Sequence, residues 1–258
     1  MGKKGLTNEQ WNQISKIIQK ENNERKNEKI DLSKSVLPKL ENEIKNLGFN
    51  FNNVFEIKKI CQDNPDITKN SVICCYKDSI YNTEKSFLLE CLYSYRNTDL
   101  IPFFIEELYK NDSSFVRVVL GNCLLRTPDK KYIDNYMQLM YDKKLCKEWP
   151  YIGNCISNTA DIKYKDNYLE MLNDINQEQS LVYIIWTVSK LKIKEAIPSM
   201  ISMLNNHELC YHILEALNKY KDPNLLPYFE KYKNDDNADI RNAAKKGIKT
   251  IEELLKIE

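Results

Sequence analysis

The chain has 258 residues, and its 42% of hydrophobic and 29% of charged side chains exclude the low-hydrophobicity class of disordered proteins. Its 38 basic and 37 acidic residues are interspersed, which disfavours a nucleic-acid partner, because such proteins usually carry a basic excess or stripe. No apolar run approaches the roughly 18 to 20 residues that span a bilayer, and the N-terminus lacks the apolar core of a signal peptide. We therefore expect a cytoplasmic protein without a membrane partner.

The first predicted helix starts near Thr7, which forms a capping-box pattern with Gln10. Its apolar residues lie on one stripe: Trp11, Ile14, Ile17 and Ile18. A polar connection, 21–31, separates this helix from an amphipathic segment over 33–47 that ends at Gly48, a typical helix C-cap. We expect residues 1–66 to form N-terminal helices that cap the remaining structure, because an open end would expose an apolar face.

A helix pair is predicted next, over 67–80 and 83–96, and further pairs follow at a nearly fixed interval. Each pair is anchored by Pro or Asp near the start of its first helix: Pro102, Asp134, Asp166, Pro198 and Pro227. Successive anchors are 32, 32, 32 and 29 residues apart. A period in this range is typical of stacked units, each too small to bury its own apolar face.

Within a unit, the first helix carries apolar residues at i, i+3, i+4 and i+7, as in Ile101, Phe104, Ile105 and Leu108. Proline costs nothing at a helix start, and aspartate favours the positive end of the helix dipole. A polar turn and a second helix follow, and no alternating β-branched run indicates a strand. The spacing predicts an all-α protein in which residues 67–258 form repeats, continuous with 1–66 as one domain.

The repeats resemble the HEAT family. The segment from Asp235 to Ala244 is similar to the turn and second helix of that family, with an acidic turn followed by Ile240-Arg241 and small residues. The first unit resembles it through Asp112 and Arg117, whereas the middle units depart from it. The resemblance implies a right-handed α-solenoid of antiparallel helix pairs. The heavy use of Lys, Asn and Ile suggests an AT-rich genome, such as a bacterial one, and small bacterial HEAT-like proteins include toxin-neutralising partners and regulatory adaptors.

Few residues are arranged for catalysis or metal binding. The eight cysteines contain no C-x-x-C pair, and Cys123 and Cys155 stand where small residues pack between helices, so we interpret them as reduced core residues rather than redox groups. His207 and His212 are five apart and do not share a helix face as paired metal ligands do. We expect no metal, no cofactor and no catalytic residue.

The alternative function is a HEAT-like DNA-binding protein related to alkylpurine DNA glycosylases. In that family an aspartate follows a tryptophan by four positions, on a helix at a concave surface. Here Gly153 follows Trp149 and Lys190 follows Trp186 at that spacing. Neither side chain can stabilise a developing cationic sugar, so the residues disfavour this enzyme.

The repeat register instead indicates a protein-binding surface on the second helices. The residues that we expect to bind a partner in a concave groove are Arg117, Asn122, Trp149, Asn154, Leu181, Trp186, Tyr211 and Glu215. Tryptophan, tyrosine and arginine are favoured interface anchors, although Trp149 and Trp186 packed between neighbouring units would be an ordinary core. The leading hypothesis is a monomeric, non-catalytic scaffold or adaptor for a protein or peptide.

Overall fold

The structure, a computed structural model, describes residues 28–93, 98–174 and 178–256, and all regular secondary structure in these ranges is helical. The prediction of an all-α protein is confirmed for this part of the chain. The helix predicted around Trp11 lies outside it. Contacts divide the chain into two compact units, Met1–Pro128 and Asp129–Glu258, called unit 1 and unit 2 below. None of the described helices combines the length and apolarity that crossing a membrane requires.

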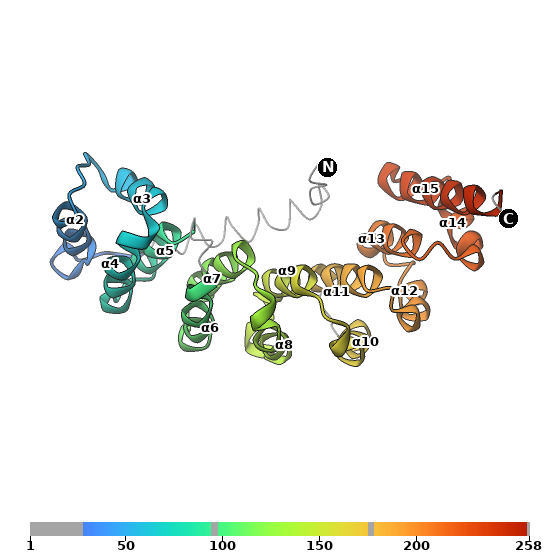
Figure 1. Ribbon diagram of the computed structural model, residues 1–258, viewed down its shortest axis with the longest axis horizontal. Helices are drawn as coiled ribbons and strands as arrows, with labels where there is room; N and C mark the ends of the chain where they lie inside the picture. Colours follow the sequence, from blue (N-terminus) through green and yellow to red (C-terminus); the bar gives the residue numbers. More distant parts are fainter. Residues whose placement is uncertain (1–27, 94–97, 175–177, 257–258) are drawn as a thin grey trace. The chain divides into compact units, whose positions relative to one another are not determined.

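Unit 1 contains six described α-helices, labelled as in Figure 1: α2 (Leu37–Asn46), α3 (Val54–Asp63), α4 (Pro65–Asp78), α5 (Asn82–Cys91), α6 (Ile101–Lys110) and α7 (Ser114–Arg126). Neighbours along the chain pack together from α2 to α5, and α6 packs on α7. The helix α5 also packs against α3 and α7. The segments predicted over 33–47, 67–80 and 83–96 agree with α2, α4 and the described part of the α5 region. Gly48 has a left-handed φ of 90° after α2, as expected of a C-cap.

The helix α3 was not predicted. Its start is specified by Asn53, whose side chain accepts hydrogen bonds from the backbone N–H groups of Phe55 (3.0 Å) and Glu56 (3.1 Å). Only Ile57 and Cys61 are buried on this helix, which is too short a stripe to stand out in the sequence.

Unit 2 contains eight described α-helices: α8 (Ile133–Tyr141), α9 (Trp149–Thr159), α10 (Lys165–Asp174), α11 (Glu178–Lys190), α12 (Ile197–Ser202), α13 (His207–Asn218), α14 (Leu226–Tyr232) and α15 (Ala238–Leu255). The even-numbered helices are the first helices of their pairs, and each packs on the odd-numbered helix that follows it. The second helices pack in succession, α9 on α11, α11 on α13 and α13 on α15. Figure 1 shows α9, α11 and α13 on one side of unit 2, with α8, α10 and α12 on the other.

The predicted helix starts are confirmed at the anchor residues. Pro102, Pro198 and Pro227 are each the second residue of a helix, α6, α12 and α14 respectively. Asp134 and Asp166 lie in the first turns of α8 and α10. The sequence did not indicate that short 3₁₀ helices lead into these first helices: Thr98–Leu100, Lys130–Tyr132, Ile162–Tyr164, Lys194–Ala196 and Pro223–Leu225.

The buried core of unit 2 has the same repeat as its helix pairs. One large buried residue occupies the same place on each first helix: Tyr136, Tyr168, Met200 and Phe229. Small buried residues likewise recur at one position of the second helices: Cys155, Thr187 and Ala216. Burial also raises the pKa of the Cys155 thiol, and of Cys123 in unit 1, well above the usual value, so both thiols stay protonated. These cysteines are core residues, as predicted.

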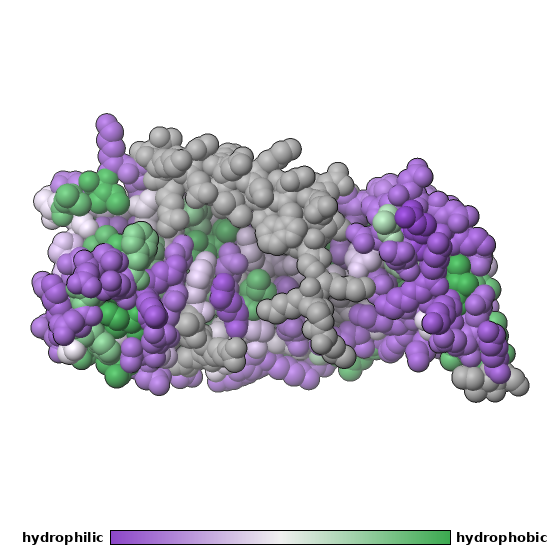
Figure 2. Space-filling model, turned by 90° about the horizontal axis from the view of Figure 1, so that it is seen from above, coloured by the Kyte–Doolittle hydropathy of each residue, from purple (hydrophilic) through white to green (hydrophobic). Residues whose placement is uncertain are grey.

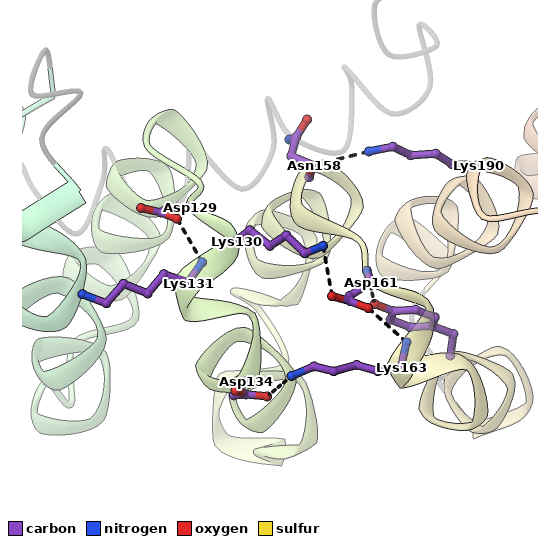
Figure 3. A network of polar contacts seen from close by, with 9 residues as sticks. Asp129, Lys130, Lys131, Asp134, Asn158, Asp161, Lys163 and Lys190 are labelled. Carbon is purple, nitrogen blue, oxygen red and sulfur yellow. Dashed lines mark hydrogen bonds and ion pairs between the residues drawn. The ribbon is translucent and has the colours of Figure 1, made fainter.

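Polar contacts in unit 2 follow the same 32-residue spacing (Figure 3). The carboxylates of Asp129 and Asp161 accept hydrogen bonds from the backbone N–H groups of Lys131 (2.9 Å) and Lys163 (3.1 Å). Ion pairs then join adjacent repeats, Lys130 with Asp161 at 3.0 Å and Lys163 with Asp134 at 3.2 Å. The two ion pairs join the same two repeats and contribute little energy alone, because their lysines are exposed. The hydrogen bonds of Asp129 and Asp161, 32 residues apart, are the equivalent contacts of the two repeats.

Candidate functional site

Four rings gather where α11 packs against α13: Tyr183, Trp186, Tyr211 and His212, called the aromatic cluster below. Tyr183 and Trp186 are three residues apart on α11 and therefore neighbours on one helix face, with 5.5 Å between ring centroids. Trp186 meets His212 of α13 at 5.4 Å, and His212 meets Tyr211 at 5.1 Å. All three contacts are edge to face, the arrangement that the charge distribution of aromatic rings favours.

The aromatic cluster is partly open to solvent. His212 is only 3% exposed, whereas Tyr183, Trp186 and Tyr211 are half-buried. Burial lowers the pKa of His212 to about 4, and the nearby charge of Glu215 opposes this shift without cancelling it. The imidazole is therefore neutral at pH 7. The partly exposed rings of Trp186 and Tyr211 pack against this uncharged side chain.

Polar groups border the aromatic cluster on two sides. On α9, the side chain of Asn154 hydrogen-bonds with Tyr183 and accepts from the amide of Asn158 at 2.6 Å. On α13, the half-buried Glu215 forms an ion pair with Lys246 of α15 at 2.8 Å. A partly apolar surface with amide and charged groups at its border is the composition of a protein interface.

Unit 2 therefore brings together four of the predicted partner-binding residues: Asn154, Trp186, Tyr211 and Glu215. The alternative that Trp186 is an ordinary core residue does not describe it fully, because its ring is half-buried. Leu181, by contrast, is only 6% exposed and lies in the core of unit 2.

Trp149 is the first residue of α9 and is half-buried. Its indole N–H is buried and has no hydrogen-bond acceptor among the described residues. A buried donor without an acceptor is unfavourable. The ring contacts of the aromatic cluster among the described residues do not include Trp149.

Arg117 and Asn122 belong to α7 of unit 1, and both side chains make structural contacts. Nη1 of Arg117 donates to the carbonyl oxygens of Asn111 and Asp112, each at 2.9 Å, and so holds the turn between α6 and α7. The Asn122 amide donates to the carbonyl of Val118 at 3.1 Å, within its own helix. Both residues are half-buried, so parts of their side chains stay accessible.

Exposed apolar side chains also occur in unit 1, where Figure 2 shows hydrophobic residues at the surface. The most exposed large ones are Leu32 at 80% and Phe55 at 76%. They lie on separate elements, before α2 and at the start of α3, and the sequence register did not identify them.

The sequence reasoning missed Tyr183 and His212. Tyr183 could have been found, since it precedes Trp186 by one helical turn. The spacing of the two histidines disfavoured a metal site, and the structure buries His212 against the ring of Trp186 from another helix. Nothing in its own spacing indicates that contact.

The described residues offer no metal site, because no group of three His, Cys, Asp or Glu side chains lies close enough to hold an ion. The glycosylase positions contain no acid. Gly153 packs so closely on Tyr183 that an added Cβ would lie 3.2 Å from that residue's Cβ, and Lys190 donates to the carbonyl of Ser157 at 3.0 Å.

No protein-family model matches the sequence, and a comparison with curated proteins finds no match. The similarity to HEAT repeats therefore depends on the period, the anchor residues and the turn residues of this chain alone.

Proposed function

We propose that this protein is a non-catalytic interaction module of the cytoplasm that binds a protein or peptide on the second helices of unit 2. The observation that supports it is the aromatic cluster at the junction of α11 and α13: the half-buried rings of Trp186 and Tyr211 pack against the buried, neutral His212, and the half-buried Tyr183 packs against Trp186. Aromatic side chains held in one orientation by their neighbours bind a partner with little further loss of conformational entropy.

The proposal includes the architecture. We infer that the helix pairs of each unit are HEAT-like repeats in a right-handed α-solenoid, with the second helices facing a concave groove. Two contact patterns support this inference: the second helices of unit 2 pack in succession, and Arg117 and Arg241 each hold the turn before their own helix. A monomeric adaptor without a cofactor, including a toxin-neutralising partner in a bacterium, fits such a module.

The test compares proteins retained by the immobilised full chain with those retained by Trp186→Glu, using extracts of the source cell. We expect at least one protein to bind the wild type and to be lost from Trp186→Glu, because a charge at the centre of the aromatic cluster opposes apolar contact. Phe55→Glu is the matched control, since it places the same charge on an exposed ring of unit 1 and should retain the partner.

Equal retention by Trp186→Glu and the wild type would contradict the assignment of the surface. Retention of DNA in place of any protein would favour the alternative, a HEAT-like DNA-binding protein related to alkylpurine DNA glycosylases.

A further inference from the structure

A group of positive charges adjoins the aromatic cluster. It consists of Lys190, Lys192, Lys219 and Lys246, called the lysine cluster below. Lys190 is the last residue of α11, Lys192 follows in the turn, Lys219 follows α13, and Lys246 lies in α15. All four residues are exposed, although the ammonium group of Lys219 is partly shielded from solvent.

Hydrogen bonds hold three of these side chains at the ends of the second helices. Nζ of Lys190 donates to the carbonyls of Ser157 at 3.0 Å and Asn158 at 3.4 Å, across the end of α9 (Figure 3). Nζ of Lys192 donates to the carbonyl of Lys219. Nζ of Lys219 in turn donates to Oγ of Ser189 at 3.4 Å, beside Lys190.

Lys246 completes the group through its ion pair with Glu215 at 2.8 Å. Four ammonium groups and one carboxylate give a local net charge of +3 (4 − 1), whereas the whole chain carries only +1. Partial burial lowers the pKa of Lys219 below its usual value; Glu215 opposes the shift, and the charges of Lys192, Lys246 and Lys190 reinforce it. The four charges therefore interact across the surface of unit 2.

The backbone at Lys192 gives independent support for a role of its side chain. Lys192 has a φ of 58°, in the left-handed region, at the C-terminus of α11. The backbone N–H of Lys192 donates to the carbonyl of Ser189 at 3.3 Å, and the backbone N–H of Ile193 donates to the carbonyl of Val188 at 2.9 Å. This pair of hydrogen bonds is the Schellman motif. Glycine adopts this conformation with less strain than lysine.

The same replacement occurs one repeat later. Lys221, 29 residues after Lys192, has a φ of 54° beyond the end of α13. Lysine therefore occupies the position that favours glycine in two successive repeats. Stabilisation of the turn does not explain this choice, because glycine would stabilise the turn better.

The lysine cluster and the aromatic cluster share one surface. Trp186 and Lys190 are four residues apart on α11, and Glu215 and Lys219 have the same spacing at α13, so each pair lies on one helix face. Figure 2 shows that the surface over the C-terminal helices is mainly hydrophilic. An occupant of the aromatic cluster therefore has the lysine cluster directly beside it.

We propose that unit 2 binds an acidic peptide segment of a protein partner, with an apolar residue on the aromatic cluster and neighbouring carboxylates on the lysine cluster. This inference rests on the proposed function and specifies the chemistry of the partner. Exposed ammonium groups attract carboxylates over about a Debye length and steer their approach, and the half-buried rings provide the apolar contact.

A nucleic acid fits the observations less well. Single-stranded nucleic acid follows a continuous basic groove, one phosphate after another. Here the lysine cluster lies at the ends of α11 and α13 and at one residue of α15, and the acidic Glu215 lies among its lysines. The α9 positions next to the cluster are the neutral Asn154 and Asn158.

The test uses the full chain and a fluorescein-labelled heptapeptide with a central phenylalanine flanked by three glutamates on each side. Glutamine and lysine versions of the peptide, and a uridine decanucleotide, are the comparison probes. Fluorescence anisotropy should show the acidic peptide binding about tenfold tighter than the glutamine peptide at low salt. That ratio should shrink several-fold when the ionic strength rises from about 0.05 M to about 0.3 M.

Three variants test which residues produce the preference for the acidic peptide. Lys190→Gln/Lys219→Gln should lose the preference for the acidic peptide and keep the affinity for the glutamine peptide. Trp186→Ala should weaken both. Lys130→Gln/Lys163→Gln is the matched control, because it removes two exposed, ion-paired lysines of unit 2 from another part of the surface and should change neither affinity. Thermal melting should show all three variants folded.

Each of the other outcomes contradicts the lysine-cluster proposal, the proposed function, or both. Equal binding of the acidic and glutamine peptides, or a preference that survives Lys190→Gln/Lys219→Gln, overturns the lysine-cluster proposal and leaves the proposed function standing. Tighter binding of the oligonucleotide than of the acidic peptide overturns both in favour of a nucleic-acid partner. If no probe binds, the lysine-cluster proposal fails, and partner retention by Trp186→Glu decides the proposed function separately.

Discussion

The indole of Trp186 meets the imidazole of His212 edge to face, with 5.4 Å between ring centroids and 69° between ring planes. The two residues lie on different helices, α11 and α13, and one ring is half-buried while the other is buried. This contact fixes the orientation of a partly exposed tryptophan. Because the two rings are in contact, the protonation state of His212 also affects the surface that Trp186 forms.

The first prediction concerns the difference between the exposed and buried faces of α11. Trp186→Ala should lower the free energy of unfolding by about 1 to 2 kcal/mol, since it removes two edge-to-face contacts of a half-buried ring. Ile184→Asp should lower it by about 4 kcal/mol or more, because Ile184 is 0% exposed and the carboxylate would be buried without a partner. Urea unfolding of both variants measures the difference. Equal losses would mean that Trp186 is a core residue.

The second prediction concerns pH. The pKa of His212 is about 4 in the folded protein and about 6.5 when the side chain is solvated, so the unfolded state takes up a proton first as the pH falls. The contribution of His212 to stability is fully present above pH 6.5 and is lost progressively towards pH 4. Between about pH 7.5 and 4.5 it should amount to about 2 to 3 kcal/mol.

His212→Phe tests this contribution, because phenylalanine keeps an aromatic ring and has no proton to gain. The loss of unfolding free energy between these two pH values should be smaller in His212→Phe than in the wild type. His207→Phe is the matched control, since His207 is exposed at the start of the same helix and should leave the loss as large as in the wild type. An unchanged pH dependence in His212→Phe would show that the imidazole is hydrated.

The third prediction concerns the close packing of α14 on α15. A Cβ added at Gly247 would lie 2.4 Å from ring atoms of the fully buried Phe229. Gly247→Ala should therefore lower the free energy of unfolding by about 1 to 3 kcal/mol. This loss is expected even though alanine has a higher helix propensity than glycine. Asn242→Ala, at an exposed position of α15, should instead be neutral or slightly stabilising.

A compensating variant identifies the cause. Phe229→Leu/Gly247→Ala should be less destabilised than the sum of its single substitutions, because the smaller side chain makes room for the methyl group. Additive losses would show that the ring of Phe229 moves aside in Gly247→Ala.

The sequence was informative about helix starts because proline and aspartate act locally. Pro102, Pro198 and Pro227 favour a first turn because proline lacks the N–H that a helix start leaves unbonded, and each is the second residue of its helix. Gly48 identified a C-cap for the same reason. Lys192 and Lys221 show the limit of such signals, since their left-handed backbone occurs without glycine.

The faces of the second helices were less predictable. The helix α11 packs against α9, α10 and α13, so its apolar surface is broad and includes buried residues on several rows: Leu181, Val182, Ile184, Ile185 and Val188. The repeat register aligns equivalent positions of the second helices but cannot decide where that apolar surface ends. Trp186 was identified from the repeat register and the preference of tryptophan for interfaces, whereas the burial of His212 depends on α11, which lies elsewhere in the sequence.

The last prediction concerns Arg117 and Arg241, which make the same contact in different units. Nη1 of Arg117 donates to the carbonyls of Asn111 and Asp112, and Nη1 of Arg241 donates to those of Asp235 at 2.5 Å and Asp236 at 3.3 Å. Each guanidinium thus satisfies carbonyl groups in the turn before its helix. These are charge-assisted hydrogen bonds, and removing them takes a donor from the carbonyls of the half-buried Asn111 and Asp235.

Arg117→Met and Arg241→Met should each lower the free energy of unfolding by about 1 to 2 kcal/mol, measured by urea denaturation. Arg126→Met is the control, because Arg126 is exposed and its guanidinium only stacks on the ring of Tyr93, 4.7 Å from the centroid, so its loss should stay below about 1 kcal/mol. Similar losses for Arg117→Met and Arg241→Met are required if the two turns are equivalent parts of a repeat. A loss confined to one of them would mean that the shared geometry is coincidental and would weaken the proposed HEAT-like architecture.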